Sequence, residues 1–274
     1  MPPKAKKTYD VVGQGIKTLV DHETPDVDIV CVPGLGANPE ESWKSTDAKS
    51  PYNWLSDTDG LKRDFPKARV LLYQYESAWS GALRVKQFLG NIATTLLHGL
   101  STERENAQRR PIVFIGHSMG GLVVAKAVVT AESRRDLFPL MFEAITGCLF
   151  FGTPFAGTKA AAAAAMLASI GEKMDLATSS KLLDMMKPDD EGLNELRNDF
   201  VRLAGKLTPK IELFCFYEEQ PTDFAQLAGL PSLFGLWKMA IPKVMPPPGG
   251  RKRARALTPA ARKSKSSSPG PRPR

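Results

Sequence analysis

The chain has 274 residues, of which 42% are hydrophobic, 24% charged and 8% aromatic, values typical of one globular domain or at most two. Its formal net charge of +8 is unevenly distributed, because residues 246–274 hold nine Lys and Arg and no Asp or Glu. The rest of the chain is slightly acidic, which argues against a folded surface that binds nucleic acid.

Short apolar runs alternate with longer helical stretches over residues 8–245, the predicted globular domain. The runs show little polar alternation, as expected for strands buried on both faces. Strands separated by helices predict an α/β fold with a mostly parallel sheet and helices on both faces. The predicted strands are 28–32, 69–75, 111–116, 146–151 and 211–217, and the predicted helices are 83–97, 120–133 and parts of 160–207.

Both ends of this pattern differ from its centre. Residues 15–20 are expected to form an antiparallel hairpin with 28–32 at the sheet edge. Residues 157–207 are predicted to form a helical cap. After Thr222 the pattern weakens, with a short strand near 236–241 as one alternative. Residues 1–7 form a basic extension, and residues 246–274 are too polar and too rich in Pro and Ser to fold, so we expect a disordered tail.

Signals for membrane insertion, secretion and disulfides are weak. The alanine-rich run at 160–170 has about half of the ~20 apolar residues that a membrane-spanning helix requires. The basic N-terminus precedes no apolar segment, so we expect no secretory signal peptide. Cys31, Cys148 and Cys215 each lie in an apolar run, which favours buried reduced thiols over a disulfide or a metal site.

The strongest local pattern is PIVFIGHSMGG at residues 111–121, where a buried strand runs into a glycine-flanked serine and then into a helix. Gly116 and Gly120 lie two positions before and after Ser118, the spacing of a strained turn that lifts a serine hydroxyl above a sheet. We interpret this segment as a nucleophile elbow. The alternative is a glycine-rich turn with a serine that caps the helix.

A serine nucleophile also needs backbone amides that stabilise the oxyanion formed during acyl transfer. One amide is expected from Met119, which follows the predicted nucleophile at the start of a helix. The second is expected from Leu35, in the Pro-Gly-Leu-Gly loop after strand 28–32, where Gly34 permits a close approach. The alternative for this loop is an ordinary glycine turn.

Five segments in order, VDIVCVPGLGANPEESW, FPKARVLLYQYES, IGHSMGGLVVAKAV, LFFGTPFAGT and FCFYEEQPT, resemble the α/β-hydrolase domain of the serine-active-site-containing (SERAC-type) lipase-like proteins. They also resemble the module ahead of nucleotide-binding or ankyrin regions in large receptor-like proteins. The resemblance spans about residues 10–222 and implies an α/β-hydrolase fold, Ser118 as nucleophile, and esters, chiefly of lipids, as substrates. Such proteins usually have His-Gly where this chain has Pro33-Gly34.

The acid of a catalytic triad should follow a strand beyond the elbow, because this fold orders its triad Ser, acid, His. Strand 211–217 delivers Glu218 to that position, and the resemblance of FYE-x-x-PT to the family favours Glu218. Asp223 is a second candidate, with Glu219 beside the first. All three carboxylates can also be read as solvated surface groups.

A triad histidine is missing after Glu218. His22 precedes the catalytic segments, His98 is expected to end a helix before the elbow, and His117 is expected to point away from the Ser118 hydroxyl. The resemblance implies a catalytic histidine with a last strand and helix, where this chain has its Pro-rich tail, so the C-terminal strand and helix are expected to be truncated. Strand 211–217 is then an exposed edge that residues 224–241 can cover.

The missing base decides the expected activity. Removing the histidine of a serine protease lowers kcat by a factor on the order of 10⁶ and leaves about 10³–10⁴ over water. We therefore expect a feeble carboxylic ester hydrolase of the lipase type, with the ester or lipid as its ligand. The alternative is a non-catalytic interaction module, which would take a protein partner, or a truncated gene product. No cofactor and no metal ion are expected.

The basic tail has several interpretations. Its RKRAR and RKSK runs are typical of a nuclear import signal, a nucleic-acid contact or an anionic-membrane contact. It can also be a solvated tail without a role, or the product of a misread coding end. The resemblance instead implies mitochondrial or endoplasmic-reticulum membranes, with peripheral association because no spanning segment is expected.

Overall fold

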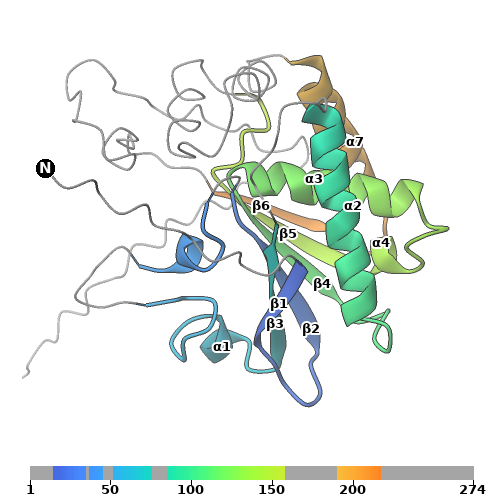
Figure 1. Cartoon of the computed structure of the whole chain (residues 1–274). Helices are drawn as coiled ribbons and strands as arrows, with labels where there is room; N and C mark the ends of the chain where they lie inside the picture. The colour runs from blue at the N-terminus through green and yellow to red at the C-terminus, as the bar shows by residue number, and fades with distance from the viewer. Residues whose placement is uncertain (1–14, 35–36, 46–51, 76–84, 158–189, 217–274) are drawn as a thin grey trace, which may run out of the picture.

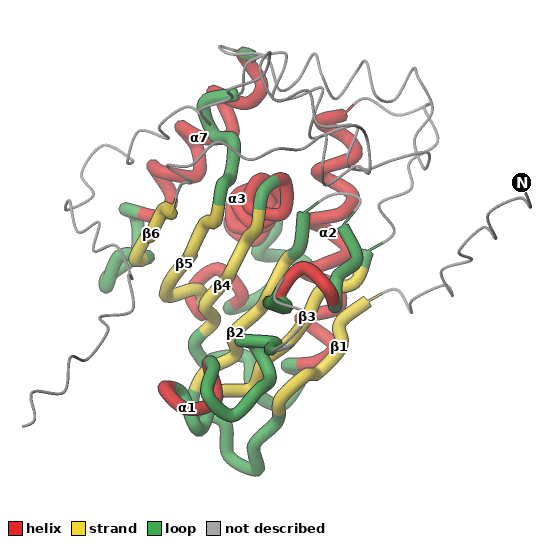
Figure 2. The backbone as a smooth tube through the Cα atoms, turned by 90° about the vertical axis from the view of Figure 1, so that its left-hand side faces the viewer, coloured by secondary structure: helices red, strands yellow, loops and turns green. Residues whose placement is uncertain are grey.

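The computed structural model describes residues 15–34, 37–45, 52–75, 85–157 and 190–216. Its centre is a six-stranded sheet, and Figure 2 shows the strands side by side. From one edge to the other these are β1 (Gly15–Val20), β3 (Ala68–Gln74), β2 (Val27–Val32), β4 (Ile112–His117), β5 (Ile145–Phe151) and β6 (Glu212–Phe216).

Only β1 runs against its neighbour, and the other adjacent pairs are parallel. The predicted strands agree with the structure to within one residue at nearly every end, because runs of β-branched and aromatic residues without polar alternation mark strands that are buried on both faces. The α/β class and the mostly parallel sheet are thus confirmed.

The expected hairpin between residues 15–20 and 28–32 is wrong, because the structure pairs residues 15–20 with a different strand. β1 is antiparallel and lies at the edge, but it pairs with β3, with Ile16 opposite Tyr73 and Thr18 opposite Leu71. β3 occupies the position beside β2 through a parallel pairing that aligns Asp28 with Arg69. The crossover from β2 therefore places β3 between β1 and β2.

Three long helices cover one face of the sheet, as Figure 1 shows. They are α2 (Val85–Glu103), α3 (Met119–Ser133) and α7 (Glu191–Ala204), with the short α4 (Met141–Ala144) at the far end of α3. The opposite face is covered by the connection from β2 to β3, which carries η1 (Glu41–Trp43) and α1 (Leu61–Asp64) and buries Trp43 and Leu55.

Helix α2 continues beyond its predicted end at residue 97. Leu100 is fully buried and extends the apolar face, so the helix ends only at Glu103. Gly99 does not break it, because a Cβ atom there would lie 3.0 Å from Ile16 Cγ1 of β1, and the glycine lets the helix approach the edge strand. His98 consequently lies inside the helix instead of ending it.

Helix α7 is the described part of the region predicted to form a cap. Asp190 caps its start by accepting a hydrogen bond from the Leu193 amide at 2.8 Å. Leu193, Phe200 and Leu203 are buried in the core shared with α3. Residues 158–189 lie outside the described residues, as do 1–14, the strand suggested at 236–241 and the tail at 246–274.

Strand β6 forms the sheet edge opposite β1 within the described part of the chain. Phe214 and Phe216 are 47% and 38% exposed, and Phe216 stacks on Phe151 of β5 at 4.8 Å between ring centroids. Residues 224–241, expected to cover this edge, are not among the described residues. None of the described helices combines the length and the hydropathy needed to cross a bilayer.

A buried ion cluster ties the amino ends of the strands to α2. Asp28 is fully buried and accepts hydrogen bonds from Arg69 Nε at 2.8 Å, from Arg110 Nη1 at 3.1 Å and from Arg104 Nη1. Arg104 is 1% exposed and also donates to the Gln108 carbonyl at 3.1 Å. Burial lowers the pKa of Arg104, and the charge of Asp28 opposes that effect. The cluster lies at the amino ends of the strands, whereas Ser118 follows the carboxyl end of β4.

Candidate active site

Ser118 lies at the junction between β4, which ends at His117, and α3, which begins at Met119. Its φ of 52° and ψ of −127° are strained for a residue with a side chain. Strained backbone of this kind is characteristic of a strand-to-helix turn that presents a nucleophile. In the fold, Ser118 therefore follows the carboxyl end of β4, a central strand of the sheet.

Hydrogen bonds fix this turn to the neighbouring strand. The Ser118 amide donates to the Phe151 carbonyl at 2.7 Å, and the Gly121 amide donates to the Ser118 carbonyl at 3.0 Å. Phe151 is the last residue of β5, and the Gly152 amide donates to the Phe216 carbonyl at 2.9 Å. The ends of β4, β5 and β6 are thus joined through the backbone next to the serine.

Glycine is required at two positions of the turn because other backbone approaches too closely. A Cβ atom at Gly120 would lie 2.3 Å from the Pro33 carbonyl oxygen and 2.4 Å from that of Val32. A Cβ atom at Gly116 would lie 2.6 Å from the Gly121 Cα. Gly120 lets the first turn of α3 pack against the end of β2 and its loop, and Gly116 lets β4 approach that turn.

That loop approaches Ser118 closely, at the place where a second oxyanion amide was predicted. A Cβ atom on Gly34 would lie 3.3 Å from Ser118 Cβ. The Tyr75 hydroxyl donates to the Pro33 carbonyl at 2.9 Å and so holds the loop. Burial raises the pKa of Tyr75, so its phenol stays a donor. Leu35, the predicted amide donor, lies outside the described residues, whereas Met119 is buried as the first residue of α3.

The three histidines are far apart in the fold. His22 Nδ1 accepts a hydrogen bond from the Thr24 amide at 3.0 Å in the turn before β2. This turn lies at the amino ends of the strands, whereas Ser118 follows the carboxyl end of β4. The exposed His98 packs against Phe138 at 4.9 Å between ring centroids, beyond the end of α3. Since α3 is about 22 Å long, His98 is remote from Ser118.

His117 is the histidine beside the serine. It is half-buried, and its ring meets the Trp43 ring at 6.2 Å between centroids with an interplanar angle of 69°. A Cβ atom on Gly34 would lie 3.5 Å from its Nδ1. The imidazole therefore lies close to both the β2 loop and the Trp43 ring.

Two contributors to this site were not singled out from the sequence. Thr153 is 2% exposed and packs against Gly121, where a Cβ atom would come within 2.6 Å of its Cγ2. Trp43 packs against His117 from a loop some seventy residues earlier. The Gly-Thr-Pro after the strand at 146–151 was a usable signal for Thr153, whereas the contact of Trp43 depends on tertiary structure alone.

The predicted acids Glu218, Glu219 and Asp223 lie outside the described residues, directly after β6. Among the described side chains, no cluster of three or more His, Cys, Asp and Glu is arranged to hold a metal ion. The chemically distinctive feature of the described part is the strained serine at the β4–α3 junction.

Comparisons with known proteins identify relatives of this chain. A family model described as "Putative serine esterase (DUF676)" matches residues 23–192. The chain is 25% identical over 218 residues to protein SERAC1 of Danio rerio, covering 78% of this chain and 30% of that protein. It is 27% identical over 182 residues to SERAC1 of Mus musculus, covering 66% and 26%. The chain thus spans less than a third of the length of these curated relatives.

Solved structures give more distant similarities. Phospholipase PlaB from Legionella pneumophila is 13% identical with a TM-score of 0.49, covering 73% of this chain and 40% of that one. Lipase BlEst2 from Bacillus licheniformis is 14% identical with a TM-score of 0.41, covering 77% and 75%. The strand order and the family match, which extends over more than half of the sequence, show that the chain belongs to the DUF676 serine esterase family, with a SERAC-type α/β-hydrolase domain.

Proposed function

We propose that this chain is a serine hydrolase of carboxylic esters, including lipid esters, with Ser118 as nucleophile. The observation that carries the proposal is the positive φ of Ser118 at the β4–α3 junction. A serine in an ordinary helix or turn has no reason to adopt this conformation, which costs about 1–3 kcal/mol. The family match over residues 23–192 supports the same reading.

In the proposed reaction the Ser118 oxygen attacks the ester carbonyl and releases the alcohol. The amides of Met119 and Leu35 donate hydrogen bonds to the oxyanion, and Gly34, Gly116 and Gly120 permit the close backbone approach that this requires. Water then hydrolyses the acyl-enzyme and frees the carboxylate. Glu218 is proposed as the acid that would orient a base, within a domain of residues 8–245 whose cap we assign to residues 157–207.

The rate of this reaction is proposed to be low. Each histidine of the 274-residue chain is either remote from Ser118 or, in the case of His117, packed against Trp43. A serine hydroxyl without a positioned base is a poor nucleophile at neutral pH. Loss of the base lowers kcat by a factor on the order of 10⁶ relative to a complete triad.

Hydrolysis of p-nitrophenyl butyrate by the purified chain tests this function. We expect slow turnover above the buffer rate, which Ser118→Ala abolishes. Ser133→Ala is a matched control, because Ser133 is the exposed last residue of the same helix and donates only to the Thr130 carbonyl at 3.3 Å. Equal turnover by the wild-type chain and Ser118→Ala would exclude Ser118 as nucleophile.

The second candidate function is a non-catalytic interaction module. The distribution of histidines favours it, because His22 and His98 lie far from the elbow and the His117 ring packs against Trp43. A folded wild-type chain without any turnover dependent on Ser118 would support the module. Turnover that Ser118→Ala removes would support the hydrolase.

A further inference from the structure

Strand β6 presents two exposed phenylalanines on one of its faces. Successive side chains of a strand point to opposite faces of the sheet. Leu213 and Cys215 pack against the core that the three long helices cover. Phe214 and Phe216 alternate with them and are 47% and 38% exposed. These two rings therefore lie on the face of the sheet that the long helices do not cover.

The neighbouring strand continues this apolar face. β5 and β6 are parallel, with Leu149 aligned to Phe214 and Phe151 aligned to Phe216. The rings of Phe151 and Phe216 stack at 4.8 Å between centroids, and the Trp54 ring meets Phe151 at 6.1 Å. Leu149 and Phe151 are themselves only partly buried. An apolar strip thus extends from the β2–β3 connection to the edge strand β6.

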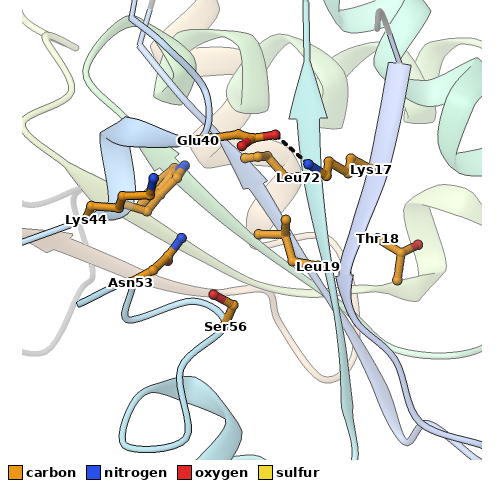
Figure 3. Close-up of a pocket in the computed structure, with 9 residues that line it drawn as sticks. Lys17, Thr18, Leu19, Glu40, Lys44, Asn53, Ser56 and Leu72 are labelled. Atoms are coloured by element: carbon orange, nitrogen blue, oxygen red, sulfur yellow. Dashed lines mark hydrogen bonds and ion pairs between the residues drawn. The ribbon is translucent and has the colours of Figure 1, made fainter. Parts of the chain in front are cut away.

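Nearer to β1, the β2–β3 connection covers this same face. Figure 3 shows Leu72 of β3 with Lys44 and Asn53 of that connection around one small cavity. Leu72 is fully buried and belongs to the same hydrophobic cluster as Leu149 and Phe151. The exposed rings on β6 show that the cover does not extend over that strand in the described part of the chain. Burying these rings would be favourable, because it removes apolar surface from water.

The chain itself supplies an apolar segment directly after β6. Of the 18 residues at 224–241, twelve are apolar and one, Lys238, is charged. The seven residues 217–223 separate this segment from β6. A linker of that length reaches at most about 25 Å, which is enough to return the segment to the strand. Such a short tether gives an effective concentration in the millimolar range.

A second copy of the chain is a weaker candidate for the same face. The exposed parts of Phe214 and Phe216 together offer about 200 Å², given the size of a phenylalanine side chain. A stable interface between two proteins buries ~800 Å² on each partner. A tethered segment needs no comparable area, because it loses little translational and rotational freedom when it packs.

We infer that residues 224–241 pack against this face of the sheet, with their apolar side chains on Phe214 and Phe216. The segment then extends over β6 the cover that the β2–β3 connection gives to the other strands. Packing would also fix the far end of residues 217–223, which contain the proposed acid Glu218. Only this last consequence rests on the proposed function, and the packing itself is tested without any ester.

A photo-cross-linker in place of Phe214 identifies the occupant directly. p-Benzoylphenylalanine keeps an aromatic side chain at this exposed position, so the full chain is expected to fold. After irradiation, peptide mass spectrometry should find the cross-linker attached within residues 224–241 of the same chain. The matched control carries it in place of Phe65, which is 52% exposed directly after α1, and should show no attachment to 224–241.

Four outcomes of this experiment would overturn the inference. The first two are no attachment and attachment to another segment of the chain. The third is attachment between chains, seen as peptide pairs that combine ¹⁵N-labelled and unlabelled protein, which would assign the face to a second copy. The fourth is attachment to phospholipid of added phosphatidylcholine vesicles in place of 224–241, which would assign it to a lipid surface.

Hydrogen exchange measured by mass spectrometry gives a second test. In the wild-type chain, the amides of 224–241 should exchange at least about tenfold more slowly than in an unstructured chain. Phe214→Thr removes the ring but suits a strand, and it should remove most of this protection. Phe65→Thr should leave it unchanged, and peptides from β4 report whether each variant is folded. Unprotected amides at 224–241 in the wild type, or equal protection in a folded Phe214→Thr, would contradict the assigned packing.

Discussion

Ser118 adopts a positive φ although it carries a side chain, and the residues around it explain why this conformation persists. Its amide is bound to Phe151, and the adjacent turn is packed against the carbonyls of Val32 and Pro33. Strained residues are retained only where their surroundings determine the backbone. The glycine spacing in the sequence predicted this turn, although the contacts that exclude a side chain at Gly120 come from Val32 and Pro33, far away in the chain.

Gly120→Ala tests the packing of the turn. The added methyl group would lie 2.3 Å from the Pro33 carbonyl oxygen, and a backbone atom cannot move aside as a side chain can. We expect the free energy of unfolding, measured by urea denaturation, to be about 1–3 kcal/mol lower than in the wild type. Gly205→Ala is the control, because its methyl group would meet the Arg202 carbonyl at an ordinary 3.6 Å. Equal stability of the two variants would contradict the account.

Other parts of the site were not accessible to sequence reasoning. The contact of Trp43 with His117 and the hydrogen bond from Tyr75 to Pro33 join residues far apart in the chain. Periodicity indicates which residues are buried, but it does not indicate which distant side chain meets them. Leu35 and Glu218 stay predictions, since they lie outside the described residues.

Among the elements, the positions of the strands along the sequence were predictable, whereas their neighbours in the sheet were not. A continuous apolar run marks a strand buried on both faces, as in β2 and β4. The position of β1 beside β3 depends on the crossover after β2, which the local sequence pattern does not predict. The end of α2 was missed for a related reason, because Leu100, beyond the predicted end, is buried by tertiary packing.

The Asp28 cluster determines how firmly β2, β3 and α2 are joined at their far end. Asp28→Asn would leave Arg104, which is 1% exposed, without its carboxylate partner. We expect a loss of about 3–5 kcal/mol in the free energy of unfolding, measured by urea denaturation. Asp136→Asn should change stability by less than about 1 kcal/mol, since its pair with Arg134 is exposed. A similar small loss in both variants would show that the cluster is not structural.

At the scale of the whole molecule, buried thiols and phenols make stability depend on alkaline pH. Cys31, Cys148 and Cys215 are free, and burial raises the pKa of each, to about 11 for Cys215. Burial also raises the pKa of Tyr73. In the unfolded chain, thiols ionise near pH 8.5 and phenols near pH 10.

The free energy of unfolding is therefore expected to fall as pH rises above about 8.5. Above that pH the unfolded chain releases protons that the folded chain retains, so the unfolded state binds fewer protons and gains stability. Below it the contribution of these groups is constant. Urea midpoints at pH 7.5 and pH 10 check this, and an unchanged midpoint at pH 10 would contradict the assigned burial.

Labelling with a fluorophosphonate probe, followed by mass spectrometric mapping of the modified peptide, tests the reactivity of Ser118 most directly. The account predicts that phosphonate is attached to Ser118 in the folded chain and that Ser118→Ala and prior unfolding in urea both abolish the modification. Modification of another residue, or of the unfolded chain alone, would contradict the assignment of Ser118 as a nucleophile presented by the fold.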